Sequence, residues 1–379
     1  MPSPSSPPAP PGQGSSMPVN SFDEVPQTPS SQESTNPSSF QVRDFIPRRF
    51  LRNGHAQTIA GNFLPRTDRL PPPTRELVEV SPAVGTQIPT QVLCLCHWQP
   101  ADVRAQRPTA IIVHGLEGSS ESQYVVGNAN KLWRAGANVI RMNMRNCGGP
   151  NYAMARLTPT LYHSGLSGDV DAVMRFFLTR ERLRSISLIG YSMGGNLVLK
   201  LAGELADAAP PQLHSVIGVS PAIDLGPSAT ALHRPENRVY EWKFLRALLR
   251  RFRHKVRLFP RVYDPNRAVG VRSLRDFDDR ITALYSGFAS AEDYYFRAAA
   301  ARVIQRIAVP ALILHSLDDP FVVITPETLA QIDANPHITL IQTAHGGHCA
   351  FLAPQPPASP GDDGYWAETT LLRFLLAHA

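Results

Sequence analysis

Cysteine is scarce in this chain of 379 residues, which carries four: Cys94, Cys96, Cys147 and Cys349. Their spacing matches neither a disulfide framework nor a zinc site, so neither is expected and no bound metal is predicted. Cys94 and Cys96 stand two apart in a strand-like run, so they share one face of that strand and should be buried as small apolar groups. A protein without disulfides suits a reducing compartment, and we expect it in the cytoplasm.

Long apolar runs are also missing. No stretch approaches the roughly 18 apolar residues that a membrane-spanning helix requires. No block of lysine and arginine alternates with aromatic residues, so the formal net charge of +6 does not indicate a nucleic-acid surface. A soluble protein that acts on a small molecule is the expectation.

The chain begins with a stretch that is unsuited to folding. Residues 1–40 are mostly proline, serine, glycine, glutamine, asparagine and threonine, which cannot bury enough apolar surface to offset ordering. We predict a disordered tail over residues 1–42, and this tail lacks the basic start and apolar core of a secretory signal. Because 43% of all residues are hydrophobic, the remainder can bury a sizeable core, and we predict one domain over residues 43–379.

Strand-like apolar runs alternate with helical segments through this domain. The runs lie at 76–80, 91–98, 109–113, 137–144, 186–190, 213–219, 308–315 and 338–343. Such alternation indicates β-α-β units in a mostly parallel sheet flanked by helices, an α/β fold. Residues of about 221–307 are mostly helical and rich in arginine. They cannot extend the sheet, so we predict that they form a helical cap above it.

The clearest motif is Gly190-Tyr191-Ser192-Met193-Gly194, which fits G-x-S-x-G and lies between an apolar strand and a helical segment. A serine on such a tight turn occupies strained backbone space, and the glycines let strand and helix approach closely. Its hydroxyl is raised above the sheet, at the positive end of the next helix. The pattern is loose by itself, but the flanking strand and helix favour Ser192 as a nucleophile over a chance pair of glycines.

A nucleophilic serine needs a base to take its proton and a carboxylate to orient that base. Functional residues collect at the carboxyl ends of parallel strands, so both groups should follow the two strands after the cap. The first of these strands ends in Asp318-Asp319-Pro320. Asp319 is the better acid because it directly precedes the proline, and Asp318 is the fallback.

The second strand ends in His345-Gly346-Gly347-His348. His348 is preferred as the base because it follows the glycine pair, while His345 is interpreted as a loop histidine and His315 as packed at its strand end. The order Ser192, Asp319, His348 is the one expected of a triad in an α/β-hydrolase.

Attack on a carbonyl also requires amides that stabilise the oxyanion. One is the backbone N–H of Met193, directly after the nucleophile, and the other should come from the turn after the strand at 109–113. That turn reads His114-Gly-Leu-Glu-Gly118, and the amide of Leu116 is our choice. The turn lacks the G-x-G-x-x-G and G-K-[ST] spacings, so a nucleotide site is not favoured.

Further segments accompany these motifs, and together they span residues 53–351. They are Asn53-x-His55-x-Gln57-Thr58, Met144–Gly149, Leu161–Gly165, Phe277–Thr282, Gly287-Phe288, Asp293-Tyr294-Tyr295 and Asp318–Phe321. With the motifs above, they resemble the α/β-hydrolase superfamily, and within it the branch of YheT and the embryogenesis-associated proteins, which includes membrane-associated eukaryotic relatives.

The resemblance implies carboxylester hydrolysis on acyl substrates without a cofactor, and a triad of Ser192, Asp319 and His348. Some relatives act on lipids or transfer acyl groups to alcohols. Two features depart from the family pattern, the proline- and serine-rich tail and a lengthened loop over 353–360, and they bear on substrate scope rather than on the triad.

We therefore expect a serine hydrolase that cleaves carboxylic esters with short- to medium-chain or lipid-like acyl groups. Acyl transfer to an alcohol by the same triad is the alternative, and a non-catalytic protein that binds acyl ligands is a third hypothesis. The filled triad positions argue against the third. His55 is interpreted as structural, and Tyr162 and His163 are candidates for lining the cleft without a catalytic role.

The cap contains a helical pattern over residues 240–257. Its apolar positions recur at helical spacing, with arginines on the other face; they are Trp242, Leu245, Leu248 or Leu249, and Phe252. We expect a cap helix that covers the active-site cleft with its apolar face. The alternative is peripheral contact between this basic amphipathic helix and an anionic membrane surface. The oligomeric state stays open.

Overall fold

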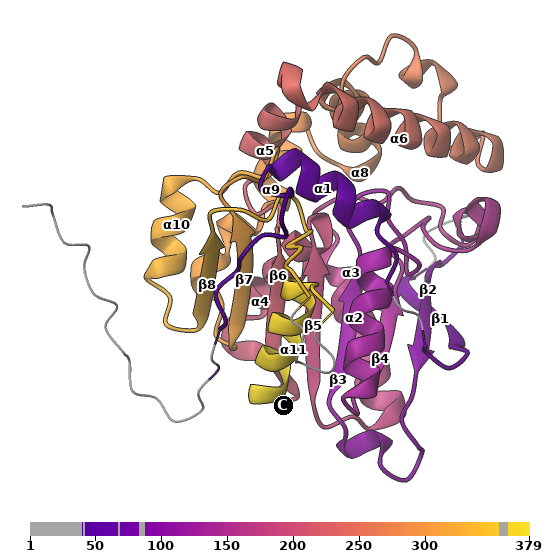
Figure 1. The fold of residues 1–379 in the computed structure, drawn as a ribbon. Coiled ribbons are helices and arrows are strands. Elements are labelled where there is room, and N and C mark those ends of the chain that lie inside the picture. Colours follow the sequence, from indigo (N-terminus) through magenta and orange to yellow (C-terminus); the bar gives the residue numbers. More distant parts are fainter. Residues whose placement is uncertain (1–39, 41, 67–68, 83–87, 356–362) are drawn as a thin grey trace, which may run out of the picture. The chain divides into compact units, whose positions relative to one another are not determined.

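An eight-stranded sheet forms the centre of the computed structural model (Figure 1), with the strand order β1-β2-β4-β3-β5-β6-β7-β8. The strands are β1 (Thr74–Ser81), β2 (Thr90–His97), β3 (Thr109–Val113), β4 (Asn138–Met142), β5 (Ile186–Tyr191), β6 (Leu213–Val219), β7 (Ala311–Ser316) and β8 (Ile338–Thr343). β2 pairs antiparallel with β1 and with β4, and all other neighbours are parallel. The predicted α/β fold with a mostly parallel sheet is confirmed.

The structure describes residues 40, 42–66, 69–82, 88–355 and 363–379. All of them belong to one compact unit, residues 40–379. The tail predicted over residues 1–42 lies outside the described residues, apart from residues 40 and 42.

The central strands are buried on both faces, because helices cover each side of the sheet. Every residue of β3 and β5 is buried. Alternate side chains enter two different cores: Ile111 packs with helices α3 (Ser167–Glu181) and α4 (Met193–Leu205), and Ile112 packs with α2 (Gln123–Arg134) and α11 (Trp366–Ala377). Figure 1 shows α2 and α11 together on the near face. This continuous apolar character is typical of strands in a two-sided parallel sheet.

Burial decides the state of the cysteines in β2. Cys94 and Cys96 are both buried and join the same core, as predicted from their spacing. Burial raises the pKa of both thiols well above the ordinary value, so they stay protonated. The four cysteines are all free thiols in the described part of the chain.

Helices fill the long connection between β6 and β7, and Figure 1 shows them beyond the carboxyl ends of the strands. They are α5 (Leu225–Leu232), α6 (Arg238–Leu258), α7 (Leu274–Phe277), a π-helical turn (Asp278–Ala283), α8 (Leu284–Ser286) and α9 (Ala291–Ala298). The remaining helices are α1 (Gly54–Phe63), before the sheet, and α10 (Pro326–Asp333), between β7 and β8. Pairing of β7 starts at Ala311 rather than at residue 308, because Pro310 has no N–H to donate to a ladder.

Helix α6 corrects part of the prediction for the cap. Leu245, Leu248 and Phe252 are buried as expected, but Trp242 is 59% exposed. Arginines were expected on the face opposite the apolar positions, yet Arg251 is buried, and so is Lys255. The prediction failed here because each of these two cations finds polar partners inside the fold, which no spacing along the helix reveals.

The outer face of α6 is strongly basic. Val239 and Trp242 are exposed on it, and its exposed cations are Arg238, Lys243, Arg246, Arg250, Arg253 and Arg257. At about 100° per residue, all of these positions fall within an arc of about 140°. The acid of this helix, Glu241, is buried and paired with His233. No helix in the described residues is long and apolar enough to cross a membrane.

Candidate active site

Ser192 lies on the turn between β5 and α4 with a strained backbone, φ 53° and ψ −116°. A side chain at Gly190 would clash with the Gly194 backbone, and one at Gly194 would clash with the carbonyl oxygens of Val113 and His114. The strand and helix can therefore approach this closely only with glycine at both positions. The geometry is that of a nucleophile elbow, in which the serine stands at the end of the strand.

His348 and Asp319 form a close, enclosed pair after the ends of β8 and β7. The Nδ1 atom of His348 is 2.8 Å from Oδ2 of Asp319, and the Asp319 side chain is 1% exposed. The other carboxylate oxygen accepts the amides of Phe321 at 3.1 Å and Val322 at 2.9 Å. These bonds fix the carboxylate and leave Nε2 of His348 as the nitrogen that can face a substrate or a serine.

Burial and pairing act in opposite directions on this pair. Burial alone would raise the pKa of Asp319, but the charge and hydrogen bond of His348, together with the Val322 amide and His315, hold that pKa below its ordinary value. Burial alone would lower the pKa of His348, but the Asp319 carboxylate and the neighbouring Cys349 together raise that pKa well above its ordinary value. The arrangement favours an imidazolium beside a carboxylate.

The histidine loop passes beside the nucleophile elbow. The Ser192 amide donates to the Val219 carbonyl at 2.9 Å, and Sγ of Cys349 lies 3.7 Å from the same oxygen. The Cys349 amide also donates to the Ser220 hydroxyl. Since Cys349 directly follows His348, the structure brings the imidazole, its carboxylate and Ser192 to the same edge of the sheet.

The alternative residues occupy other positions. Asp318 accepts the Gly347 amide at 2.8 Å and lies 3.4 Å from Nδ1 of His345, so it shapes the loop without contacting His348. His315 is buried in β7, and burial lowers its pKa. His55 stacks on Tyr240 of α6, with 5.7 Å between ring centroids, in keeping with a structural role.

Helix α1 holds the histidine loop in place, a function that the sequence motif around residues 53–58 did not disclose. The Thr58 hydroxyl accepts the His348 amide at 2.8 Å, and the Gln57 side chain exchanges hydrogen bonds with the backbone of Leu352. Gly347 has a positive φ of 57°, and a side chain there would clash with the Gly54 carbonyl. The signal was present as the segment Asn53–Thr58, but its partner lies about 290 residues away.

The turn after β3 lies against the nucleophile. A Cβ at Gly115 would be 3.2 Å from the Ser192 Cβ. The amides around Leu116 are occupied: Gly115 donates to the Tyr124 hydroxyl, Glu117 to the Tyr162 hydroxyl, and Gly118 to the Gly115 carbonyl. Within the described residues, the amides of Leu116 and Met193 donate to no protein acceptor. Both residues line a cavity together with Ser192.

His114 supports this turn rather than the chemistry. Its Nε2 accepts the Met144 amide at 3.1 Å, which places the proton on Nδ1, 2.8 Å from the Gly115 carbonyl. Burial lowers the pKa of His114 to about 4, so it stays neutral.

A buried ion pair ties the cap to the same turn. The guanidinium of Arg251 on α6 bonds both oxygens of Glu117, at 2.9 and 3.0 Å, and also donates to the Asn146 carbonyl. The Tyr162 hydroxyl donates to Glu117 at 2.5 Å. Glu117 itself has a positive φ of 55°. We call Glu117, Arg251 and Tyr162 the clamp; because Glu117 follows Leu116, the clamp fixes the peptide next to the free amide.

The cavity beside Ser192 has a volume of about 130 Å³ and is mostly apolar. It lies under the cap: α6 contributes Phe244 and Leu248, and Phe321 packs against the His348 ring at 4.4 Å between centroids. Tyr162 and His163 line it, as considered from the sequence. No cluster of three metal-ligating side chains occurs among the described residues.

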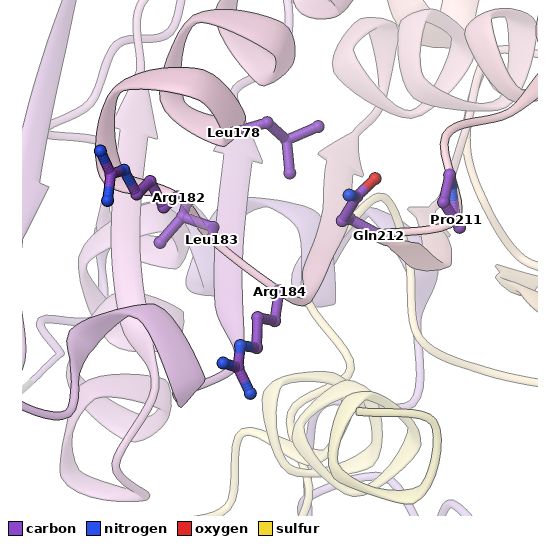
Figure 2. A pocket seen from close by; sticks show the side chains of 6 residues that line it. All are labelled: Leu178, Arg182, Leu183, Arg184, Pro211 and Gln212. Carbon is purple, nitrogen blue, oxygen red and sulfur yellow. The ribbon is translucent and has the colours of Figure 1, made fainter.

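A second hollow, of about 490 Å³, lies at the amino ends of β5 and β6, opposite the end that carries Ser192 (Figure 2). Its lining residues come just before β5 and β6 or from the end of α3; they are Leu178, Arg182, Leu183, Arg184, Pro211 and Gln212. Figure 2 shows the two arginine side chains pointing away from each other. They do not converge on a common ligand. The cavity at Ser192 is the candidate active site because the strained serine and the amide-bearing residues Leu116 and Met193 line it.

A family model described as the alpha/beta hydrolase fold matches residues 108–354. The chain therefore belongs to the α/β-hydrolase family, as its fold and nucleophile elbow indicate. The chain is 30% identical to the YheT protein of Escherichia coli over 82% of this chain and 87% of that protein. It is 24% identical to the embryogenesis-associated protein EMB8 of Picea glauca over 86% of this chain and 70% of the relative. It lies in this branch of the family, which confirms the resemblance found in the sequence.

Another relative is the phospholipase ABHD3 of Mus musculus, 28% identical over 65% of this chain. The match spans 59% of that protein's length. The name of this relative is that of an enzyme that cleaves esters, and the family is one of hydrolases.

Proposed function

We propose that this protein hydrolyses carboxylic esters through an acyl-enzyme on Ser192, with His348 as the base and Asp319 as the residue that orients it. The observation that supports this most directly is the 2.8 Å pair of His348 and Asp319 at the strand edge that carries the strained Ser192. The relative named as a phospholipase supports the same reaction class.

In the proposed reaction, Nε2 of His348 takes the Ser192 proton while the serine oxygen bonds to the substrate carbonyl carbon. The amides of Leu116 and Met193 donate to the resulting oxyanion, consistent with their lack of an acceptor among the residues that the structure describes. The imidazolium then gives its proton to the departing alkoxide, and an alcohol leaves. Water, deprotonated by the same imidazole, attacks the acyl-enzyme and releases the acid and the free serine.

The shape and chemistry of the cavity favour an acyl group of short to medium length, or the equivalent portion of a lipid-like ester. Its walls under α6 are apolar, and its volume is small. Burying methylene groups there supplies binding free energy of about 0.8 kcal/mol for each group.

The test is a panel of esters of graded acyl length, measured on the wild type and on Ser192→Ala. We expect the variant to lose turnover on every ester by a factor of about 10⁴ or more. Ser228→Ala is a matched control, because Ser228 lines the same cavity and lies outside the proposed triad. If Ser192→Ala turned over esters as fast as the wild type, the proposal would be wrong.

Acyl transfer is the second candidate, because the apolar cavity disfavours water at the acyl-enzyme. Product analysis with added alcohol separates the two reactions: free acid should dominate for a hydrolase, and a new ester at low alcohol concentration for a transferase. A serine-reactive probe that labelled wild type and Ser192→Ala equally would instead support a protein that only binds acyl ligands.

A further inference from the structure

A carboxylate lies in the lining of the substrate cavity, although the rest of that lining is largely apolar. Asp278 begins the π-helical turn Asp278–Ala283, and it lines the cavity that contains Ser192. Its Oδ1 accepts the Thr282 hydroxyl and its Oδ2 accepts the Tyr295 hydroxyl, both at 2.8 Å. Thr282 and Tyr295 line the same cavity, so these three side chains form one polar patch in its wall.

Other acidic residues of the cap accept hydrogen bonds from backbone amides, and Asp278 does not. Asp276 completes a capping box with Ser273, Asp279 accepts the Ala291 amide, and Asp224 accepts the Thr325 amide. In the described part of the chain, the carboxylate of Asp278 receives hydrogen bonds from side-chain hydroxyls and from no backbone amide. Capping therefore does not explain why an acid occupies this position.

Charge neutralisation does not explain it either. No lysine, arginine or histidine of the described residues forms an ion pair with Asp278. The nearby Arg275 is paired with Glu292 instead. Burial raises the pKa of Asp278 to about 6, against the two hydroxyl bonds and the charge of the nearby Arg275, which lower it. An acid in a substrate cavity that forms no ion pair in the described part of the chain suits an acceptor for a donor group on the ligand, and π-helical turns often occur at functional sites.

We propose that Asp278, supported by Thr282 and Tyr295, is a specificity subsite that accepts a hydrogen bond from a hydroxyl group of the ester substrate. The inference rests on the proposed function and narrows it to esters that carry a hydroxyl away from the reacting carbonyl. Each carboxylate oxygen can accept a second hydrogen bond besides the one from its present donor. A negatively charged substituent would be repelled by the same carboxylate, so the subsite also disfavours such esters.

The test compares kcat/KM for esters that differ by hydroxyl groups alone. Propyl hexanoate is the reference, 2,3-dihydroxypropyl hexanoate carries hydroxyls on the alcohol side, and propyl 6-hydroxyhexanoate carries one on the acyl side. In the wild type we expect one of the two hydroxylated esters to be preferred by about ten- to a hundredfold, as for a hydrogen bond to a charged acceptor. In Asp278→Leu the preference should fall to within about threefold, mainly because the hydroxylated ester is turned over more slowly.

Asp224→Leu is the matched control. Asp224 is a buried acid of the same cap that accepts the Thr328 hydroxyl and lies outside the substrate cavity. It should retain the wild-type preference even if it lowers stability. Asp278→Asn keeps the size of the side chain and tests the same ratio if the leucine variant folds poorly.

Two results would overturn the subsite: equal kcat/KM for all three esters in the wild type, or a preference that survives in both Asp278 variants. Neither result bears on the triad, which is judged by Ser192→Ala on the reference ester. Conversely, a Ser192→Ala variant that remained active would refute the proposed function whatever the ratio.

Discussion

Removing one partner of the clamp should destabilise the protein strongly. In Arg251→Met, Glu117 keeps the Tyr162 hydroxyl but loses both bonds from the guanidinium, while its side chain is only 11% exposed. An uncompensated buried charge typically costs about 3–5 kcal/mol of unfolding free energy. The cost should be much smaller in Glu117→Gln combined with Arg251→Met, because no charge is then left unpaired.

Urea unfolding followed by tryptophan fluorescence measures this difference. Arg175→Met is the control, because Arg175 pairs with Asp171 on an exposed helix surface, and it should change the free energy by less than about 1 kcal/mol. A change of that small size in Arg251→Met, or a double variant as unstable as the single one, would refute the reasoning.

The clamp should also affect catalysis through the peptide it holds. If the Leu116 amide donates to the oxyanion, loosening its turn should lower kcat by up to about 10²–10³ with little change in KM. We expect Glu117→Gln to lower kcat under conditions where the variant is fully folded. An unchanged kcat would show that the clamp does not position the Leu116 amide for stabilising the oxyanion.

Three further predictions concern groups elsewhere in the molecule. The base must be neutral to take a proton, so kcat/KM should fall as pH decreases through the raised pKa of His348. Asp319→Asn removes the largest cause that raises this pKa, so pH profiles should show the acidic limb at lower pH and kcat reduced by about 10⁴. Burial lowers the pKa of Lys255 to about 7 from 10.5, so the unfolded chain binds more protons than the folded protein between these pH values. The free energy of unfolding from urea titrations should therefore rise with pH across this window, and Lys255→Met should lack this rise. If the basic face of α6 contacts membranes, replacing Lys243, Arg246 and Arg250 with glutamine should weaken co-sedimentation with anionic vesicles by about fivefold for each cation removed. The control replaces Arg107, Arg134 and Arg182, at the opposite edge of the sheet, with glutamine, and it should not weaken co-sedimentation.

The sequence alone determined the features that depend on near neighbours. The elbow at Ser192 is marked by Gly190 and Gly194, which flank the serine and are required by the close approach of strand and helix, so strand, turn and helix could be located together. The parallel sheet followed from alternating apolar runs, and the rule that functional residues follow strand ends singled out Asp319 and His348 as the pair that the structure holds at 2.8 Å.

Only the tertiary structure decided which polar side chains are buried and what they contact. The helical spacing alone predicted a solvated Arg251, but this residue is buried because it pairs with Glu117, which is 134 residues away in the sequence. The same holds for Thr58, which bonds the His348 amide across 290 residues, and for Asp278, whose place in the cavity depends on how the cap folds over the sheet. A charged or polar group is stable inside a protein only with its partners, and those partners are specified by the fold rather than by local spacing.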